Sequence, residues 1–217
     1  MLLLVAMAAG AETISDVTIG NLVYSIDTDT KVATVTGYDS SNKPTDVVIP
    51  NTIEYGGNYS VTTIGEWAFC NCTSLASVNI PNSVTTIGES AFSSCESLAS
   101  IDIPNSVTTI GEFAFAYCFS LASVNIGESV TTIGLGAFIY CYYITSVTCL
   151  AKECPVCDKG LWNNIFSVFD TATLYVPKQS IDAYKTTDPW SDFVNVVALE
   201  DTGIEGKPTD NAPRVDA

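Results

Sequence analysis

Apolar and polar positions follow a pattern that returns every 23 residues through the middle of the chain. Rows that open with Ser-Val-Thr-Thr-Ile-Gly begin at Ser60, Ser83, Ser106 and Ser129. A repeat of this length is typical of solenoids, in which each unit buries its apolar face only by stacking on its neighbours. The pattern therefore predicts a stack of coils.

The same positions are apolar in every row, and these columns predict the interior. They are Val61/Val84/Val107/Val130, Ile64/Ile87/Ile110/Ile133, Ala68/Ala91/Ala114/Ala137, Phe69/Phe92/Phe115/Phe138, Leu75/Leu98/Leu121/Ile144, Val78/Ile101/Val124/Val147 and Ile80/Ile103/Ile126/Cys149. The end of each row, Leu-x-x-Val-x-Ile, alternates strictly, which is typical of a short strand that pairs with the same strand one coil away. Pro81 and Pro104 end this strand, because proline has no N–H for the ladder. We therefore expect parallel pairing along the stack.

The pattern Leu-x-x-Val-x-Ile-Pro-x-x-Val-x-x-Ile-Gly-x-x-Ala-Phe-x-x-Cys over Ser60–Ala151 resembles the BspA-like leucine-rich repeat family of bacterial surface proteins. The resemblance implies an α/β, β-rich fold: a leucine-rich-repeat solenoid, with stacked coils in a right-handed superhelix and a parallel sheet. It predicts an N-terminal β cap over residues 12–59, four 23-residue repeats over residues 60–151 and a C-terminal cap over residues 152–200. Such caps protect the terminal coils from water and from other chains.

The two ends of the chain have a different composition. Residues 1–11 form an apolar run that ends in Ala9-x-Ala11, which predicts a signal peptide, although the usual basic residues are missing before it. The run is much shorter than the ~20 residues that span a bilayer, so we expect no membrane-spanning segment. Residues 201–217, rich in Gly, Pro and Asp, predict a flexible tail that stops before the surface-sorting segment of the resemblance. These features predict a secreted or cell-surface protein.

Composition narrows the possible functions. The chain has 24 acidic and 8 basic residues, no histidine and a net charge of −16. Such a chain repels phosphate backbones, so we expect no nucleic-acid partner. Mechanisms and metal sites that need an imidazole are excluded, and we expect no catalytic residues, no cofactor and no metal. The enzymatic alternative is a glycan hydrolase that uses two carboxylates ~5–9.5 Å apart.

Cysteines recur at the repeat period. Cys72, Cys95, Cys118 and Cys141 predict a structural ladder of buried free thiols, with occasional disulfide pairing between coils as the alternative. Cys154-Pro155-Val156-Cys157 is a separate CxxC sequence. We interpret Cys154 and Cys157 as a structural disulfide or inert thiols, and a redox pair or half of a zinc site remain the alternatives.

Variable columns are the candidates for recognition. Aromatic residues accumulate there in the last two coils: Tyr117, Phe119, Tyr140, Tyr142 and Tyr143. Because Tyr and Trp offer a large contact area with few rotatable bonds, we predict a partner-binding patch; the alternative is packing beneath the C-terminal cap. Glu66, Glu89 and Glu112 also align, and Ser60–Ala151 contains no Lys or Arg. This predicts solubility, with weak cation binding as the alternative.

The expected function follows from the resemblance, which implies adhesion to host proteins or to other cells. We expect a non-catalytic module that binds a protein, such as a host extracellular-matrix or cell-surface protein, or a glycan. The alternative is a structural spacer from a larger adhesin. Fold analogy does not identify the partner, because one fold carries many functions.

Overall fold

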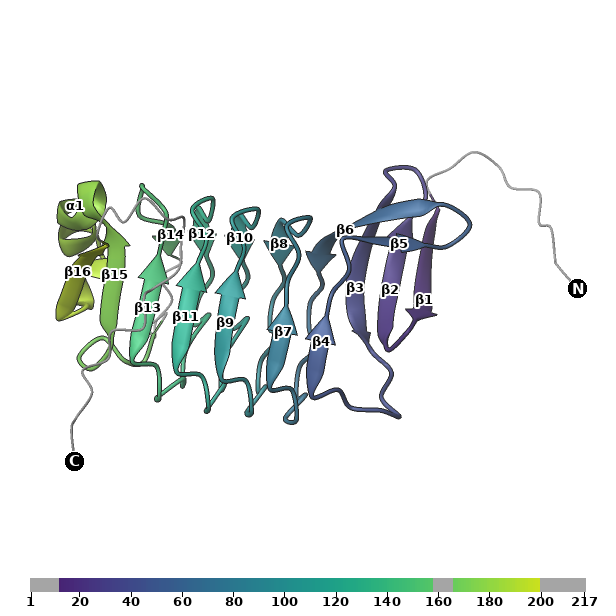
Figure 1. The fold of residues 1–217 in the computed structure, drawn as a ribbon, viewed down its shortest axis with the longest axis horizontal. Helices are drawn as coiled ribbons and strands as arrows, with labels where there is room; N and C mark the ends of the chain where they lie inside the picture. Colours follow the sequence, from purple (N-terminus) through teal and green to yellow (C-terminus); the bar gives the residue numbers. More distant parts are fainter. Residues whose placement is uncertain (1–11, 158–165, 200–217) are drawn as a thin grey trace, which may run out of the picture.

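Short parallel strands stack along one axis in the computed structural model, which describes residues 12–157 and 166–199 (Figure 1). The first face of the stack is built from the Val-Thr-Thr-Ile segments and, at its C-terminal end, from Val156–Cys157. Its strands are β6 (Asn58–Ile64), β8 (Thr86–Ile87), β10 (Thr109–Ile110), β12 (Thr132–Ile133) and β14 (Val156–Cys157). They pair in parallel and in register, so that Ile64, Ile87, Ile110 and Ile133 lie one behind the other. The predicted parallel solenoid is confirmed.

The second face is built from the Ser-Val-Asn-Ile segments of the repeats and from strands that continue them at both ends. Its strands are β4 (Asp46–Val48), β7 (Ser77–Asn79), β9 (Ser100–Ile103), β11 (Ser123–Ile126), β13 (Ser146–Cys149), β15 (Thr173–Pro177) and β16 (Asn195–Leu199). Within the described residues, β9, β11, β13, β15 and β16 form a five-stranded parallel sheet, and β4 and β7 form a separate pair. Residues that alternate along these strands point into the stack, which is why Ile101 and Ile103 are buried while Ser100 and Asp102 are exposed.

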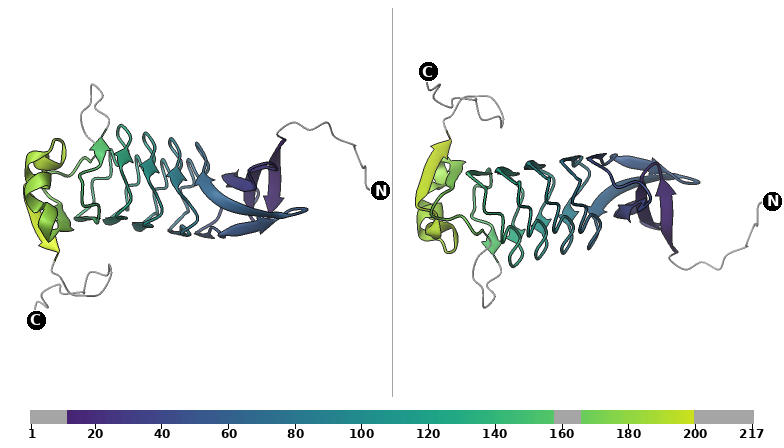
Figure 2. Two further views of the ribbon diagram at one scale, coloured as in Figure 1. Left: turned by 90° about the horizontal axis from the view of Figure 1, so that it is seen from above. Right: turned by 90° about the horizontal axis from the view of Figure 1, so that it is seen from below.

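Both ends of the stack are covered by other elements (Figure 2). At the N-terminal end, β1 (Thr13–Ile19), β2 (Leu22–Asp27) and β3 (Val32–Tyr38) pair antiparallel, and β3 then joins β6 in parallel. β5 (Thr52–Glu54) adds an antiparallel strand to β6. At the C-terminal end lie α1 (Ile181–Thr186) and two short 3-10 helices, η1 (Lys178–Ser180) and η2 (Trp190–Asp192).

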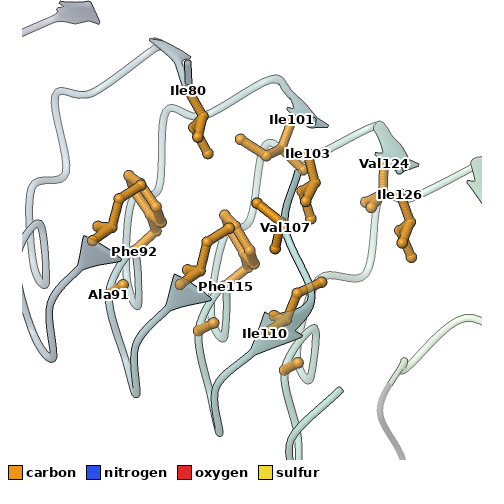
Figure 3. Packing of buried hydrophobic residues seen from close by; sticks show 14 of the residues in the cluster. Ile80, Ala91, Phe92, Ile101, Ile103, Val107, Ile110, Phe115, Val124 and Ile126 are labelled. Atoms are coloured by element: carbon orange, nitrogen blue, oxygen red, sulfur yellow. The ribbon is translucent and has the colours of Figure 1, made fainter. Parts of the chain in front are cut away.

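The interior is a continuous column of side chains, part of which is shown in Figure 3. Phe69, Phe92, Phe115 and Phe138 are fully buried, and neighbouring rings stack with centroids 5.1–5.2 Å apart. Tyr38 extends this stack at one end and Phe166 at the other. The column therefore continues past the four rows that the 23-residue period identifies.

Neighbouring coils approach most closely at the glycine that closes each Val-Thr-Thr-Ile-Gly segment. A Cβ atom on Gly134 would lie 2.4 Å from the backbone nitrogen of Glu112, and one on Gly111 would lie 2.6 Å from that of Glu89. No side chain fits at these distances. The recurring glycine is therefore required by the spacing of the coils.

Candidate functional site

The edge that joins the two faces is formed by the Glu-x-Ala-Phe-x-x-Cys turns. Its backbone is held by a further ladder of hydrogen bonds between coils. Trp67, Phe69 and Asn71 donate their N–H groups to the carbonyl oxygens of Glu89, Ala91 and Ser93 at 2.7–2.9 Å. The corresponding residues of the next two coils repeat this pattern. In the last coil, a side-chain oxygen replaces the backbone carbonyl as acceptor: the Tyr140 N–H donates to Ser167 Oγ at 2.8 Å.

This geometry places two residues of each turn in the left-handed backbone region. They are Trp67 and Asn71, Ser90 and Ser94, Phe113 and Tyr117, and Gly136 and Tyr140, with φ between 51° and 63°. Gly and Asn adopt this conformation readily, whereas it is unfavourable for bulky residues. At both left-handed positions the residue type changes from row to row, so the two positions belong to the variable columns that are candidates for recognition. The backbone fixes the directions in which these side chains leave the edge.

The last two coils carry a cluster of exposed rings on this edge, which we call the aromatic edge. Its members, with their exposed fractions, are Tyr117 (42%), Phe119 (39%), Tyr140 (36%), Tyr142 (57%) and Tyr143 (68%). Tyr117 and Tyr140 stack with ring centroids 4.6 Å apart. Phe119 meets the edge of Tyr117 at 6.2 Å, and Tyr142 meets that of Tyr140 at 6.0 Å. Tyr117, Phe119, Tyr140 and Tyr142 therefore support one another while all five rings stay exposed.

None of these five rings lies in the interior of the C-terminal cap. That interior is formed by other aromatic residues: Phe166, Phe169, Tyr184, Trp190 and Phe193. Trp190 and Tyr184 are almost fully buried, and the Trp190 indole N–H donates to the Pro155 carbonyl at 3.0 Å. The structure thus places the aromatic edge on the surface and gives the cap its own core.

The four ladder cysteines are buried behind this edge as free thiols. Cys95, Cys118 and Cys141 each donate a hydrogen bond to the carbonyl of a phenylalanine one coil earlier, Phe69, Phe92 and Phe115, at 3.0–3.3 Å. Cys72 makes the corresponding contact with the Pro44 carbonyl at 3.7 Å. Each thiol therefore satisfies a buried backbone acceptor between coils.

The surroundings of Cys95 and Cys118 suppress the ionisation of these two thiols. Burial raises the pKa of the Cys95 thiol, and the adjacent Cys141 thiol together with burial raises that of Cys118. A thiol that stays protonated is a poor nucleophile. The ladder is therefore a set of packing and hydrogen-bonding groups.

The CxxC residues Cys154 and Cys157 follow the last regular coil. Cys154 is half-buried and forms no disulfide, and burial raises the pKa of its thiol. Cys157 is buried in β14 and donates to the Pro155 carbonyl at 3.4 Å. A reactive redox cysteine requires the opposite shift, a lowered pKa. Within residues 12–157 and 166–199, no group of three or more Cys, Asp or Glu side chains is arranged to hold a metal ion.

Sequence reasoning identified the variable columns but missed their backbone conformation. The signal was present, because Gly136 occupies the first left-handed position of its turn and Asn71 the second position of its own turn, and both residue types favour the left-handed region. The thiol-to-carbonyl bonds had no such signal, since their acceptor is a backbone atom of another coil.

These features define a leucine-rich-repeat solenoid. The chain belongs to the family described as the BspA type leucine rich repeat region, whose profile matches six copies over residues 38–158. A leucine rich cell surface protein from Faecalibacterium prausnitzii is 30% identical with a TM-score of 0.62, and the match covers 80% of this chain and 45% of that protein. The chain therefore spans just under half of this relative.

A second solved structure shows the same fold at lower identity. The pneumococcal vaccine antigen PcpA is 17% identical with a TM-score of 0.53, and the match covers 79% of this chain and 51% of that one. No curated protein matches the chain in sequence. In the part of the chain that the structure describes, no helix has the length and apolar character needed to cross a membrane.

Proposed function

We propose that this chain is a non-catalytic recognition module of a secreted or cell-surface protein, and that it mediates adhesion by binding a host protein through the aromatic edge. The observation that carries the proposal is the cluster of five exposed rings on two adjacent coils. Tyr and Trp rings are enriched at the energetic centres of protein interfaces. A contiguous exposed patch of this kind on a soluble surface marks an interaction site.

The rigidity of the edge supports this role. Tyr117 and Tyr140 have fixed backbone directions, and their rings are stacked before any partner arrives. Binding then orders few additional side-chain rotations, each of which costs ~0.5–1.5 kcal/mol. The left-handed backbone at a tyrosine is unfavourable, and such strain clusters at functional sites.

The charge distribution indicates which proteins fit. Ser60–Ala151 contains no Lys or Arg, and Glu112 lies close in sequence to the edge. Arg side chains stack favourably on Tyr and Phe rings, and the net charge of −16 attracts basic surfaces. The proposed partner is therefore an extracellular host protein with exposed basic residues.

The proposal is tested by the binding of the full chain to a panel of immobilised extracellular-matrix proteins at physiological salt. A double variant, Tyr140→Ser with Tyr142→Ser, is expected to lose at least tenfold in affinity for the bound protein while its melting temperature stays close to that of the parent. Trp67→Ser is the matched control, because Trp67 is an exposed ring in the left-handed region on the first coil, away from the cluster. Equal loss in both variants, or no binding to any panel member, would contradict the proposal and favour a spacer role.

A further inference from the structure

The last strand of the second face, β16, leaves one side of its sheet open. It pairs in parallel with β15 over all five of its residues, from Asn195 to Leu199. Within residues 12–157 and 166–199 no strand pairs with its other side, and Figure 1 shows β16 at the C-terminal end of this face. The N–H and C=O groups on an open side are a template for pairing with another strand.

The strands β1, β4, β5 and β14 also lie at the margins of sheets, and each carries a feature that opposes such pairing. β1 is interrupted by a register shift beside Asp16, a residue with a φ of 59°. β4 and β5 have three residues each and contain Asp46 and Glu54, and β14 has two residues. Irregular, short or charged strands keep sheet edges from associating. In contrast, β16 has an uncharged Asn-Val-Val-Ala-Leu sequence and an unbroken register.

The outer surface beside this open side is apolar. One outward row of the second face runs through five paired strands: Asp102, Asn125, Thr148, Tyr175 and Val197. The row changes from polar to apolar toward β16, where Val197 is 44% exposed. Val194, just before the strand, is 68% exposed. Exposed apolar surface next to an open strand edge indicates a contact with another chain.

We propose that β16 pairs in antiparallel orientation with β16 of a second copy of this chain, about a twofold axis at Val197. In this register Val197 faces Val197 of the second copy, and Val196 faces Ala198 of the second copy. Directly opposite residues of antiparallel strands share a face, so outward residues meet outward ones and inward residues meet inward ones. Val196 already packs against the interior, and its pairing extends the interior across the axis. Twofold dimers of this kind are the commonest oligomers.

The charges at the two ends of β16 fit a second copy. Asp192 lies before the strand, and Lys178 follows Pro177, which pairs with Leu199 at the other end of the strand. Both charged residues are exposed. Antiparallel pairing brings Lys178 to the same end of the joined strands as Asp192 of the second copy, so opposite charges meet on both sides of the axis. The strand between them is uncharged, so no like charges face each other within it.

The net charge of the whole chain gives this dimer a characteristic dependence on salt. Two copies that each carry a net charge of −16 repel each other at long range. Salt screens this repulsion, while hydrogen bonds between strands and apolar contacts remain. The dimer is therefore stronger at high salt, whereas the binding of a basic partner is weaker. The β16 surface is separate from the aromatic edge and does not depend on the function proposed for that edge.

The first test is sedimentation velocity of the full chain from ~5 to ~500 μM, at ~50 and ~500 mM NaCl. A monomer–dimer equilibrium is expected, with at least threefold higher affinity at high salt. Val197→Asp places two carboxylates opposite each other at the axis and should lower the affinity at least tenfold. Val156→Asp is the matched control, because Val156 is an exposed valine in the marginal strand β14 of the other face, and it should dimerise like the parent.

Melting temperatures report whether each variant is folded. A chain that stays monomeric at every concentration, an affinity that falls with salt, or an equal loss in Val197→Asp and Val156→Asp would overturn the proposal.

The second test examines the register, by thiol–disulfide exchange with oxidised glutathione. Val197→Cys should form a disulfide-linked dimer, because directly opposite Cα atoms are ~4.5–5.5 Å apart, within the range that a disulfide spans. Asn195→Cys is the matched control. It faces Leu199 of the second copy, and the two introduced thiols are then about 14 Å apart along the strands, so no linked dimer should form. Equal cross-linking of the two variants, or none in either, would contradict an axis at Val197.

Discussion

The first two coils (residues 60–105) and the last two (residues 106–151) share one scaffold and differ at one edge. Their interiors are alike, with a fully buried phenylalanine in each coil. Asn71 and Ser94 occupy the second left-handed position of the first two coils, and Tyr117 and Tyr140 occupy it in the last two. The backbone is the same in all four, with φ between 59° and 63°.

This difference separates the demands of folding from the properties of the surface. Asn71 shows that a small polar residue satisfies the turn, and asparagine is among the residues that tolerate a left-handed backbone best. The fold therefore does not require a ring at Tyr117 or Tyr140. A feature that folding does not require, and that costs some stability, is a sound place to look for binding.

The largest expected effect concerns what the two halves have in common. Phe92→Ala in the first half and Phe115→Ala in the second should each lower the free energy of unfolding by about 3–5 kcal/mol, because each removes a buried ring and leaves a cavity. Urea denaturation of the two variants measures both values. A difference of more than ~2 kcal/mol between them would show that the halves are not equivalent inside.

A smaller effect is expected from the thiol ladder at alkaline pH. The folded-state pKa values of Cys95 and Cys118 lie above that of an unfolded cysteine, which is about 8.5. Between those values the folded chain holds more protons, so stability is complete below pH ~8.5 and falls as the pH rises, by ~1.4 kcal/mol per pH unit for each thiol.

Replacing one of these thiols should reduce the slope. Cys118→Ser is expected to be less stable than the parent at pH 7, and the gap between the two should narrow by about 2 kcal/mol at pH 10. Unfolding by urea at pH 7, 8.5 and 10 measures the gap. A gap that is constant with pH would mean that Cys118 ionises as readily in the folded protein as in the unfolded chain.

At the aromatic edge, replacing a tyrosine of the last two coils by the residue of the first coil should change the free energy of unfolding by no more than ~1 kcal/mol. Tyr117→Asn copies the residue of the first coil, so the relief of an unfavourable backbone, ~1–2 kcal/mol, offsets the loss of a ring contact worth ~0.5–1.5 kcal/mol. Affinity for the partner should nevertheless fall at least tenfold. A loss of more than 2 kcal/mol in thermal or urea unfolding would instead assign Tyr117 a structural role.

The smallest effect is expected at the acidic column. Glu66, Glu89 and Glu112 recur at exposed positions one coil apart. Glu89→Gln should change the free energy of unfolding by no more than ~0.5 kcal/mol, with a slight gain at low salt that disappears at high salt. Melting curves at two salt concentrations detect this. If Glu89→Gln were much more stable than the parent without calcium, and if added calcium stabilised the parent so that this difference disappeared, the acidic column would instead be a cation site.

The interior was predictable from sequence because its residues recur at a fixed spacing. Val61, Ile64 and Phe69 belong to columns that are apolar in every row, and all three are buried. The 23-residue period identifies only those coils whose sequences are 23 residues long, and it misses coils of another length. Val47 pairs with Val78 in register although they are 31 residues apart, so the strand at β4 continues the second face without obeying the period.

The site was less predictable, since exposure and contact depend on several coils at once. The sequence marked Tyr117 and Tyr140 as aromatic and variable, and the alternatives of a surface patch and cap packing could not be separated until Phe166 and Trp190 were placed in the cap.

Because every repeat has the same length, the number of coils sets the distance between surfaces at the two ends of the stack. The aromatic edge and the N-terminal cap are separated by whole coils, and adjacent coils are ~4.8 Å apart because parallel strands pair at that spacing. Removing residues 83–105 would delete one coil and rejoin matching positions, since Ser83 and Ser106 begin equivalent rows. The aromatic edge and the N-terminal cap would then lie one coil spacing, ~4.8 Å, closer together, while neither surface changed. A partner that contacts both would therefore bind the shortened chain with a different affinity.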